Sequence, residues 1–218
     1  MMKHSFAPYI QILGKGRRGA RDLDQDEARE AMTLVLSGAV EPVQLGAFLM
    51  LMRVKEETPA ELAGFVQAAR ASLPIPPDLL TVDMDWASYA GKRRQLPWHL
   101  LAALLLASHG SRVLMHGTDT GTPGRIYLPQ ALAALGLTPA ESYAEAARRL
   151  AQNRFAYLPL GSFSPILQSM LDLKSVLGLR SPVHTLVRML NPFRAQVSLV
   201  GIFHPGYDDT HQQAGLLL

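Results

Sequence analysis

Two glycine-containing segments of this sequence concentrate positive charge, and the chemistry that such segments serve is anion binding. The first segment contains four cations, Lys15, Arg17, Arg18 and Arg21. The second contains one glycine followed by three cations, Gly91, Lys92, Arg93 and Arg94. Guanidinium and ammonium groups bind phosphate oxygens through charge-assisted hydrogen bonds. The sequence therefore predicts phosphate binding at both segments, with a solvated loop that only balances surface charge as the alternative.

The second segment lies between a predicted strand at 80–87 and a predicted helix at 97–109. Pro97 suits the first position of that helix, where a missing N–H costs nothing. The loop at the carboxyl end of a strand is where an open α/β sheet binds its ligand, and a helix N-terminus attracts negative charge. We therefore expect this loop to bind either a small phosphate compound or part of a longer phosphate backbone.

The first segment favours the longer ligand, because a polyanion makes use of several separated basic patches whereas a small molecule needs only one. Its glycines at positions 14, 16 and 19 suit contacts to the phosphate backbone better than contacts to bases. The sequence contains no helix-turn-helix, zinc-finger or RNA-stacking signature. We expect binding to DNA or RNA without strong sequence preference, and a flexible solvated turn is the alternative.

Two histidines lie close to the predicted ligand edge. His99 is at the start of the predicted helix, and His116 precedes Gly117 and Thr118 at the end of another predicted strand. The two histidines are candidates for a general base, but a structural or pocket-lining role is the favoured interpretation, and all four residues are assigned to a possible pocket. No nucleophile or carboxylate can be paired with His116 from the sequence alone, so no catalytic residue is predicted. The histidines lack the i, i+4 spacing of a zinc pair and cysteine is absent, so no metal site is predicted.

The pattern before residue 73 is typical of a helical domain. Four helices are predicted there, at 7–13, 24–37, 42–54 and 59–72. Asp24 and the Thr58-Pro59-Ala60-Glu61 sequence are typical of helix starts. A proline-rich linker at 74–79 then separates the helical domain, 1–73, from a second domain at 80–218.

The pattern after the linker alternates strands with helices. Strands are predicted at 80–87, 112–116, 155–158 and 196–203. Helices are predicted at 97–109, 128–135, 142–152, 164–177 and 182–190. Such alternation is typical of an α/β domain in which a largely parallel sheet is covered by helices on both faces. Residues 100–107 include no polar side chain, so the helix that contains them is expected to be buried between layers.

The composition is that of a globular protein, with 48% hydrophobic and 18% charged residues. The sequence pI of about 9.3 is basic and agrees with an anionic partner. The absence of cysteine excludes disulfides and thiolate chemistry. The first residues lack the uninterrupted apolar core that is typical of a secretion signal, and no apolar run approaches the ~20 residues that a membrane span needs. We therefore expect a cytoplasmic protein with no membrane partner.

The last residues, Thr210 to Leu218, are typical of a helix that stops on three leucines soon after a strand. A parallel sheet that ends in this way leaves an uncovered edge. We therefore expect the sequence to be a truncated form of a longer protein.

Several segments together resemble the anthranilate phosphoribosyltransferase family. They are residues 36–65, the strand, basic loop and helix that begin at Val82, VLMHG at 113–117, and residues 177–193 and 197–205. They follow the family's order over nearly the whole chain. The resemblance implies a helical N-terminal domain, an α/β domain of the phosphoribosyltransferase type, and a homodimer formed through the helical domain. It also places Lys174 where the enzymes carry an arginine at the substrate pocket.

The sequence departs from the family where the family binds phosphate and magnesium. The family's Gly-Thr-Gly-Gly-Asp loop corresponds to residues 88–94, which keep one glycine and gain three cations. Its Asn-x-Ser-Thr motif corresponds to residues 97–100, and its Asp-Glu magnesium pair would fall after Leu218. Mg²⁺ prefers hard oxygen ligands, and Pro97 and Leu100 supply none. These departures resemble a diverged branch of the family that keeps the fold and binds nucleic acid.

These observations leave three possible functions. The leading hypothesis is a nucleic-acid-binding protein on a catalytically degenerate scaffold, without cofactor, whose phosphate contacts come from both basic segments and Lys174. The alternative is an active glycosyl- or phosphoribosyltransferase that uses phosphoribosyl pyrophosphate or a related donor, with Mg²⁺ and an altered acceptor. A purely structural partner protein is a third possibility.

Overall fold

The computed structural model describes residues 4–89, 95–118 and 124–218, which form two compact units. The helical unit consists of Met1–Ser72, Leu173–Leu186 and Ile202–Leu218. The sheet unit consists of Leu73–Asp172 and Val187–Gly201. The predicted boundary at residue 73 separates the first segment of the helical unit from the sheet unit. Residues 173–186 and 202–218, by contrast, are predicted in the α/β domain but pack with the helices.

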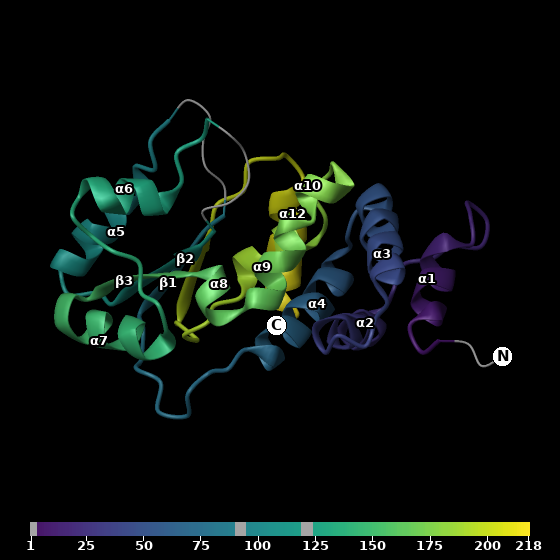
Figure 1. The fold of residues 1–218 in the computed structure, drawn as a ribbon, viewed down its shortest axis with the longest axis horizontal. Coiled ribbons are helices and arrows are strands. Elements are labelled where there is room, and N and C mark those ends of the chain that lie inside the picture. The colour runs from purple at the N-terminus through teal and green to yellow at the C-terminus, as the bar shows by residue number, and fades with distance from the viewer. Residues whose placement is uncertain (1–3, 90–94, 119–123) are drawn as a thin grey trace. The chain divides into compact units, whose positions relative to one another are not determined.

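The helical unit is built on four long N-terminal helices (Figure 1). They are α1 (Ala7–Gly14), α2 (Gln25–Leu36), α3 (Pro42–Lys55) and α4 (Pro59–Ser72). Three later helices join them, α10 (Lys174–Leu177), α11 (Val183–Leu186) and α12 (Tyr207–Leu216). All four N-terminal helices lie within two residues of their predicted bounds, because their starts are encoded locally. Asp24, for example, accepts a hydrogen bond from the Glu27 N–H in a complete capping box.

Close packing of α2 against α4 depends on a glycine. A Cβ at Gly64 would overlap the carbonyl oxygen of Gln25, so only glycine lets the two backbones approach this far. The rings of Phe6, Phe48 and Phe65 then fill the interior in edge-to-face pairs.

A buried carboxylate fixes the chain that enters α2. Glu61 is fully buried, and it accepts hydrogen bonds from the Leu23 N–H at 2.9 Å and from the Thr58 N–H at 2.8 Å. Lys55 Nζ contacts both Glu61, at 2.7 Å, and Asp22, at 2.7 Å. A buried charge must be paired, so Glu61 depends on these contacts. They hold Asp22 and Leu23, directly after the first basic segment, close to α4.

The sheet unit contains a four-stranded parallel sheet in the order β3-β2-β1-β4. The strands are β1 (Met84–Ser88), β2 (Val113–Gly117), β3 (Phe155–Pro159) and β4 (Val197–Val200). The helices are α5 (His99–Ser108), α6 (Leu128–Ala134), α7 (Tyr143–Asn153), α8 (Leu160–Phe163), α9 (Pro165–Asp172) and the 3₁₀ helix η1 (Val187–Met189). The predicted fold class, a helical bundle and a parallel α/β sheet, is confirmed.

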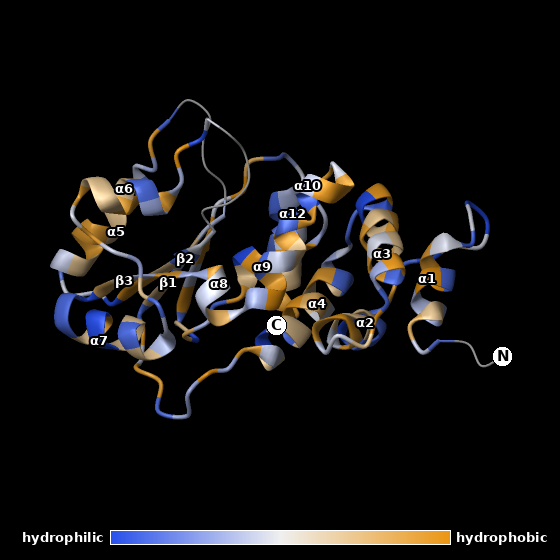
Figure 2. Ribbon diagram, viewed as in Figure 1, coloured by the Kyte–Doolittle hydropathy of each residue, from blue (hydrophilic) through white to orange (hydrophobic). Residues whose placement is uncertain are grey.

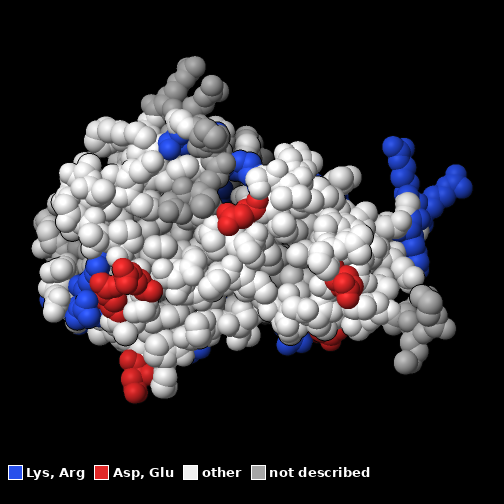
Figure 3. Space-filling model, viewed as in Figure 1, with Lys and Arg blue, Asp and Glu red and all other residues white. Residues whose placement is uncertain are grey.

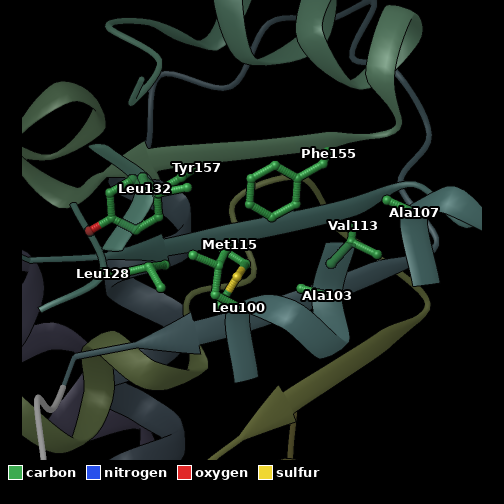
Figure 4. Close-up of a cluster of buried hydrophobic side chains, with 9 residues drawn as sticks. All are labelled: Leu100, Ala103, Ala107, Val113, Met115, Leu128, Leu132, Phe155 and Tyr157. Atoms are coloured by element: carbon green, nitrogen blue, oxygen red, sulfur yellow. The ribbon is translucent and has the colours of Figure 1, made fainter. Parts of the chain in front are cut away.

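Helices cover both faces of this sheet. On one face, Leu100 and Ala103 of α5 and Leu128 of α6 pack against Met115 and Tyr157 of the strands (Figure 4). Hydrophobic residues predominate in β3 and α5 (Figure 2). On the opposite face, Phe163 of α8 lies against the His116 ring, and Tyr143 of α7 lies against Phe163.

Three local predictions were wrong. The helix predicted at 164–177 is divided into α9 and α10, and the helix predicted at 182–190 is divided into α11 and η1. Helix α5 is not buried on all sides, because Leu101 is 49% exposed and Leu105 is 61% exposed. The physical reason is that α5 meets an apolar layer on one side only, where Leu100, Ala103 and Ala107 face the sheet.

Within residues 4–89, 95–118 and 124–218, no helix combines the length and the apolarity that crossing a bilayer requires.

Candidate ligand site at the carboxyl edge of the sheet

Strand β1 is the place where the strand order reverses. From β1 the chain moves to β2 and β3 on one side, and later returns to β4 on the other. In open α/β sheets, ligands bind outside the carboxyl ends of the strands at such a position. Ser88 is the last residue of β1, and its Oγ lies 3.1 Å from His99 Nε2 at the first position of α5. The predicted pocket residue His99 is therefore at this edge, next to a hydroxyl group.

Gly117 is needed where the ends of β1 and β2 meet. It pairs in register with Ser88, and a Cβ at Gly117 would overlap the Ser88 carbonyl oxygen. The same Cβ would lie 3.1 Å from the Tyr157 hydroxyl. Thr118 follows and is almost completely buried. Gly117 and Thr118, both predicted pocket residues, thus form the tightly packed wall of the edge.

His116 is fully buried inside a chain of polar contacts. Its Nε2 lies 3.3 Å from Asp85 Oδ2, and its Nδ1 lies 2.7 Å from the Tyr89 hydroxyl. The Ser198 hydroxyl donates a hydrogen bond to the same Asp85 oxygen at 3.0 Å. The sequence offered no partner for His116, and the structure provides two. Of the two roles considered for this histidine, its burial favours the structural one.

The direction of these hydrogen bonds depends on the tautomer of the His116 imidazole. Burial raises the pKa of the Tyr89 hydroxyl well above its usual value, and the nearby Tyr157 and Asp85 side chains raise it further. The hydroxyl therefore keeps its proton and can donate it to His116 Nδ1. In the tautomer that accepts this hydrogen bond, the neutral imidazole carries its proton on Nε2, where Asp85 can accept it.

The sequence alone did not identify Asp85 and Tyr89 as partners of His116, or Ser198 as a partner of Asp85. Asp85 stands in a segment where apolar residues alternate with acids, which is typical of a half-exposed strand. The alternation of side chains along the strand could have found it: Asp85 lies on the same face of β1 as Ala87, which is in register with His116. This alternation points to His116 only once the pairing of β1 with β2 is known.

The described residues include the first basic segment but not the second. Gly91, Lys92, Arg93 and Arg94 lie outside the described residues. Lys15, Arg17 and Arg18 are exposed, and no ion pair joins them to a carboxylate in the part of the chain that the structure describes. Figure 3 shows Lys and Arg side chains projecting where the loop after α1 lies.

Arg21 is exposed but paired with Glu27, and Lys174 is partly buried. Arg21 Nη1 and Nη2 contact the two carboxylate oxygens of Glu27 at 2.6 and 2.7 Å. Lys174 begins α10 in the helical unit and is partly buried. Of the predicted phosphate contacts that fall within the described residues, Lys15, Arg17 and Arg18 are thus the ones that are exposed and joined to no carboxylate in the described ranges.

The described residues at the edge do not fit a magnesium ion. No three His, Asp or Glu side chains gather into a possible metal site among the described residues. Asp85 is buried and already bonded to His116 and Ser198. Mg²⁺ requires several hard oxygen ligands, so no chemical step is assigned to it here.

A helical bundle together with a parallel sheet that carries a ligand edge defines the architecture of the phosphoribosyltransferases that have a helical N-terminal domain. Residues 8–73 match the helical bundle domain of a glycosyl transferase family. A crystal structure of anthranilate phosphoribosyltransferase from Thermus thermophilus superposes with a TM-score of 0.79 at 24% identity, covering 97% of this chain and 62% of that one. This likeness establishes the fold.

Two curated relatives define the family. The chain is 32% identical over 202 residues to the uncharacterized protein YbiB of Escherichia coli, and the match covers 91% of this chain and 63% of YbiB. It is 30% identical over 198 residues to the anthranilate phosphoribosyltransferase of Gluconobacter oxydans, covering 90% and 54%. The chain is thus an anthranilate phosphoribosyltransferase-like protein of the glycosyltransferase family, which confirms the resemblance. It spans between about half and two thirds of the length of these relatives.

The Arg21–Glu27 pair predicts an acid-dependent stability. The hydrogen bond from Arg21 lowers the pKa of Glu27 from 4.5 to about 2. Because the folded pKa is depressed, this contribution is present above pH 4.5 and is lost as the pH falls towards 2. Arg21→Gln should therefore lower the urea midpoint at pH 7, and the difference from wild type should vanish at the acid end. The exposed Arg18→Gln variant is the control and should match wild type throughout; a difference for Arg21→Gln that does not change with pH would contradict the assignment.

Proposed function

We propose that the carboxyl edge of the sheet binds a phosphorylated ribose donor, as part of a phosphoribosyltransferase-type protein with an acceptor other than anthranilate. The observation that carries this proposal is the Ser88–His99 pair at 3.1 Å, placed where the strand order reverses. The relatives named as anthranilate phosphoribosyltransferases support it. So does the fold shared, at a TM-score of 0.80 and 16% identity, with a Saccharomyces cerevisiae enzyme in complex with PRPP and Mg.

The side chains at this edge supply binding and orientation. The Ser88 hydroxyl and the His99 imidazole offer hydrogen bonds to phosphate or ribose oxygens. The N-terminus of α5 adds a positive potential, and the segment at 92–94 contributes three cations by sequence. In a transfer, the acceptor's nucleophilic atom bonds to ribose C1 while the bond from C1 to the pyrophosphate oxygen breaks and pyrophosphate leaves with the electron pair. Cations beside the leaving group would stabilise its growing charge.

Calorimetry with phosphoribosyl pyrophosphate, with and without Mg²⁺, tests this proposal. Wild type should bind the donor, and His99→Ala should weaken binding about tenfold, because one charge-assisted hydrogen bond is lost. His109→Ala, at the exposed far end of α5, is the control and should not change the affinity. If wild type does not bind the donor, the donor site is rejected. If His99→Ala binds the donor as tightly as wild type does, the donor does not bind at this edge.

Nucleic-acid binding is the second function that we propose, and a specific observation favours it. Lys15, Arg17 and Arg18 are exposed within four residues of the chain and have no ion-pair partner in the described ranges, whereas Arg21 next to them is paired with Glu27. Unpaired cations on a glycine-containing loop can contact successive phosphates without reading bases.

Charge reversal tests the second function. Replacing Lys15, Arg17 and Arg18 by Glu should weaken binding to a fluorescent DNA duplex and to single-stranded RNA, whatever their sequences. The salt dependence on duplex DNA should become shallower by about 0.9 in slope for each lost phosphate contact. Donor binding should stay unchanged, and the single reversal Arg148→Glu on the sheet unit serves as control. Nucleic-acid affinity that is the same before and after the triple reversal would rule out this loop as the contact.

We also propose a homodimer formed through the helical domain. Val43, Ala47, Met50 and Val54 lie on one side of α3, and Val43 and Val54 are 79% and 85% exposed. Exposed Glu41 precedes the helix, and Arg53 lies near its other end. Antiparallel pairing of α3 with a second copy would bury the apolar side and bring each Glu41 to an Arg53.

Molecular mass in solution tests the dimer. Val54→Asp should shift the mass measured by light scattering from that of a dimer to that of a monomer, because a charge would be buried without a partner. Val176→Asp, on α10 of the same unit and 79% exposed, is the matched control and should remain dimeric. A monomeric wild type, or a Val54→Asp variant that stays dimeric, would exclude this interface.

A further inference from the structure

A continuous chain of polar contacts runs beneath the candidate ligand edge. It links Ser198 on β4, Asp85 on β1, His116 on β2 and Tyr89, the residue directly after β1. Asp85 and His116 are both fully buried. The mechanism proposed above uses none of these groups, although they connect three neighbouring strands.

Stability does not explain why a carboxylate is buried here. Asp85 Oδ2 receives both hydrogen bonds, and Asp85 Oδ1 is buried without a hydrogen-bond partner among the described residues. Such an arrangement costs desolvation that an apolar side chain of similar size would avoid, and replacing buried polar pairs by apolar groups is often stabilising. The chain of contacts therefore calls for a role other than filling the sheet.

The geometry at the exit of β1 indicates that role. Ser88 and Tyr89 are consecutive, so their side chains leave the strand on opposite faces. Ser88 is bonded to His99 of α5 on one face, and Tyr89 is bonded to His116 of β2 on the other. The backbone at the end of β1 is thus held from both sides immediately before the basic segment of the sequence begins.

We propose that Asp85 and His116 act as positioning residues that fix Tyr89, and thereby fix the end of β1 for binding the phosphorylated donor. Asp85 sets the imidazole tautomer by accepting from Nε2, which leaves Nδ1 as the acceptor for the Tyr89 hydroxyl. The Tyr89–His116 ring contact, with centroids 5.2 Å apart in an edge-to-face arrangement, adds packing to the hydrogen bond. This inference rests on the donor site proposed above.

Imidazole NMR tests the hydrogen-bond chain independently of any ligand. In protein with ¹⁵N-labelled histidine, His116 should show the neutral tautomer protonated on Nε2, with a slowly exchanging Nε2 proton because the ring is buried. Tyr89→Phe should shift the Nδ1 resonance, because that nitrogen loses its donor. An imidazolium, or a tautomer protonated on Nδ1, would overturn the proposed direction of the chain.

Donor binding tests the positioning role. Tyr89→Phe keeps the ring but removes the hydroxyl, and it should weaken binding of phosphoribosyl pyrophosphate by about 3- to 10-fold, in line with the loss of one buried hydrogen bond. Tyr143→Phe is the matched control, because it removes a buried hydroxyl that has no hydrogen-bond partner among the described residues. The control should bind the donor as wild type does.

The outcomes separate this inference from the donor site. If wild type binds no donor, the proposed function fails and the positioning role fails with it, while the imidazole spectrum still decides whether the hydrogen-bond chain exists. If wild type binds the donor and Tyr89→Phe binds it equally well, the chain is only structural and the inference is overturned. Urea unfolding of Tyr89→Phe confirms that any loss of affinity is measured on folded protein.

Discussion

A carboxyl group buried inside a sheet needs hydrogen-bond partners, and Asp85 has two of them at the centre of the sheet unit. The strand that carries Asp85 pairs with β2 on one side and β4 on the other, and partners for its carboxylate come from both, His116 and Ser198. A shift of one residue in either pairing would turn these partners to the opposite face. The carboxylate therefore favours the observed register, and the register places Ser88, Gly117 and Tyr89 at one edge.

Close backbone approach is the second constraint, and glycine makes it possible in both units. Gly117 lets the end of β2 lie against the Ser88 carbonyl, and Gly64 lets α4 lie against the start of α2. In the helical unit, buried Glu61 then ties Leu23 and Lys55 together, much as Asp85 ties the strands. Each unit thus combines a glycine contact with a buried carboxyl group that has polar partners. The helical unit also carries the exposed cations Lys15, Arg17 and Arg18, and the sheet unit carries the Ser88–His99 pair.

Local chemistry explains what could be predicted. Asp24 and Pro59 mark helix starts through capping and a fixed backbone angle, which depend only on neighbours in sequence. The alternation of apolar strands with helices likewise predicts a parallel sheet. The division of the helix predicted at 164–177 was missed, because its apolar spacing continues through the break between α9 and α10 at Leu173. The exposure of α5 was missed because an apolar sequence does not say how many layers it meets.

Periodicity, caps and motifs are properties of neighbouring residues, so the helical domain, the parallel α/β class, the family and the positions of the basic segments could be predicted from the order of amino acids alone. The three-dimensional fold was needed to show that Asp85 and Tyr89 are the partners of His116, and that residues 173–186 and 202–218 pack with the N-terminal helices. Tyr89 stands 27 residues before His116, and Ser198 stands 113 residues after Asp85. Contacts over such separations depend on strand order and register, which no local pattern encodes.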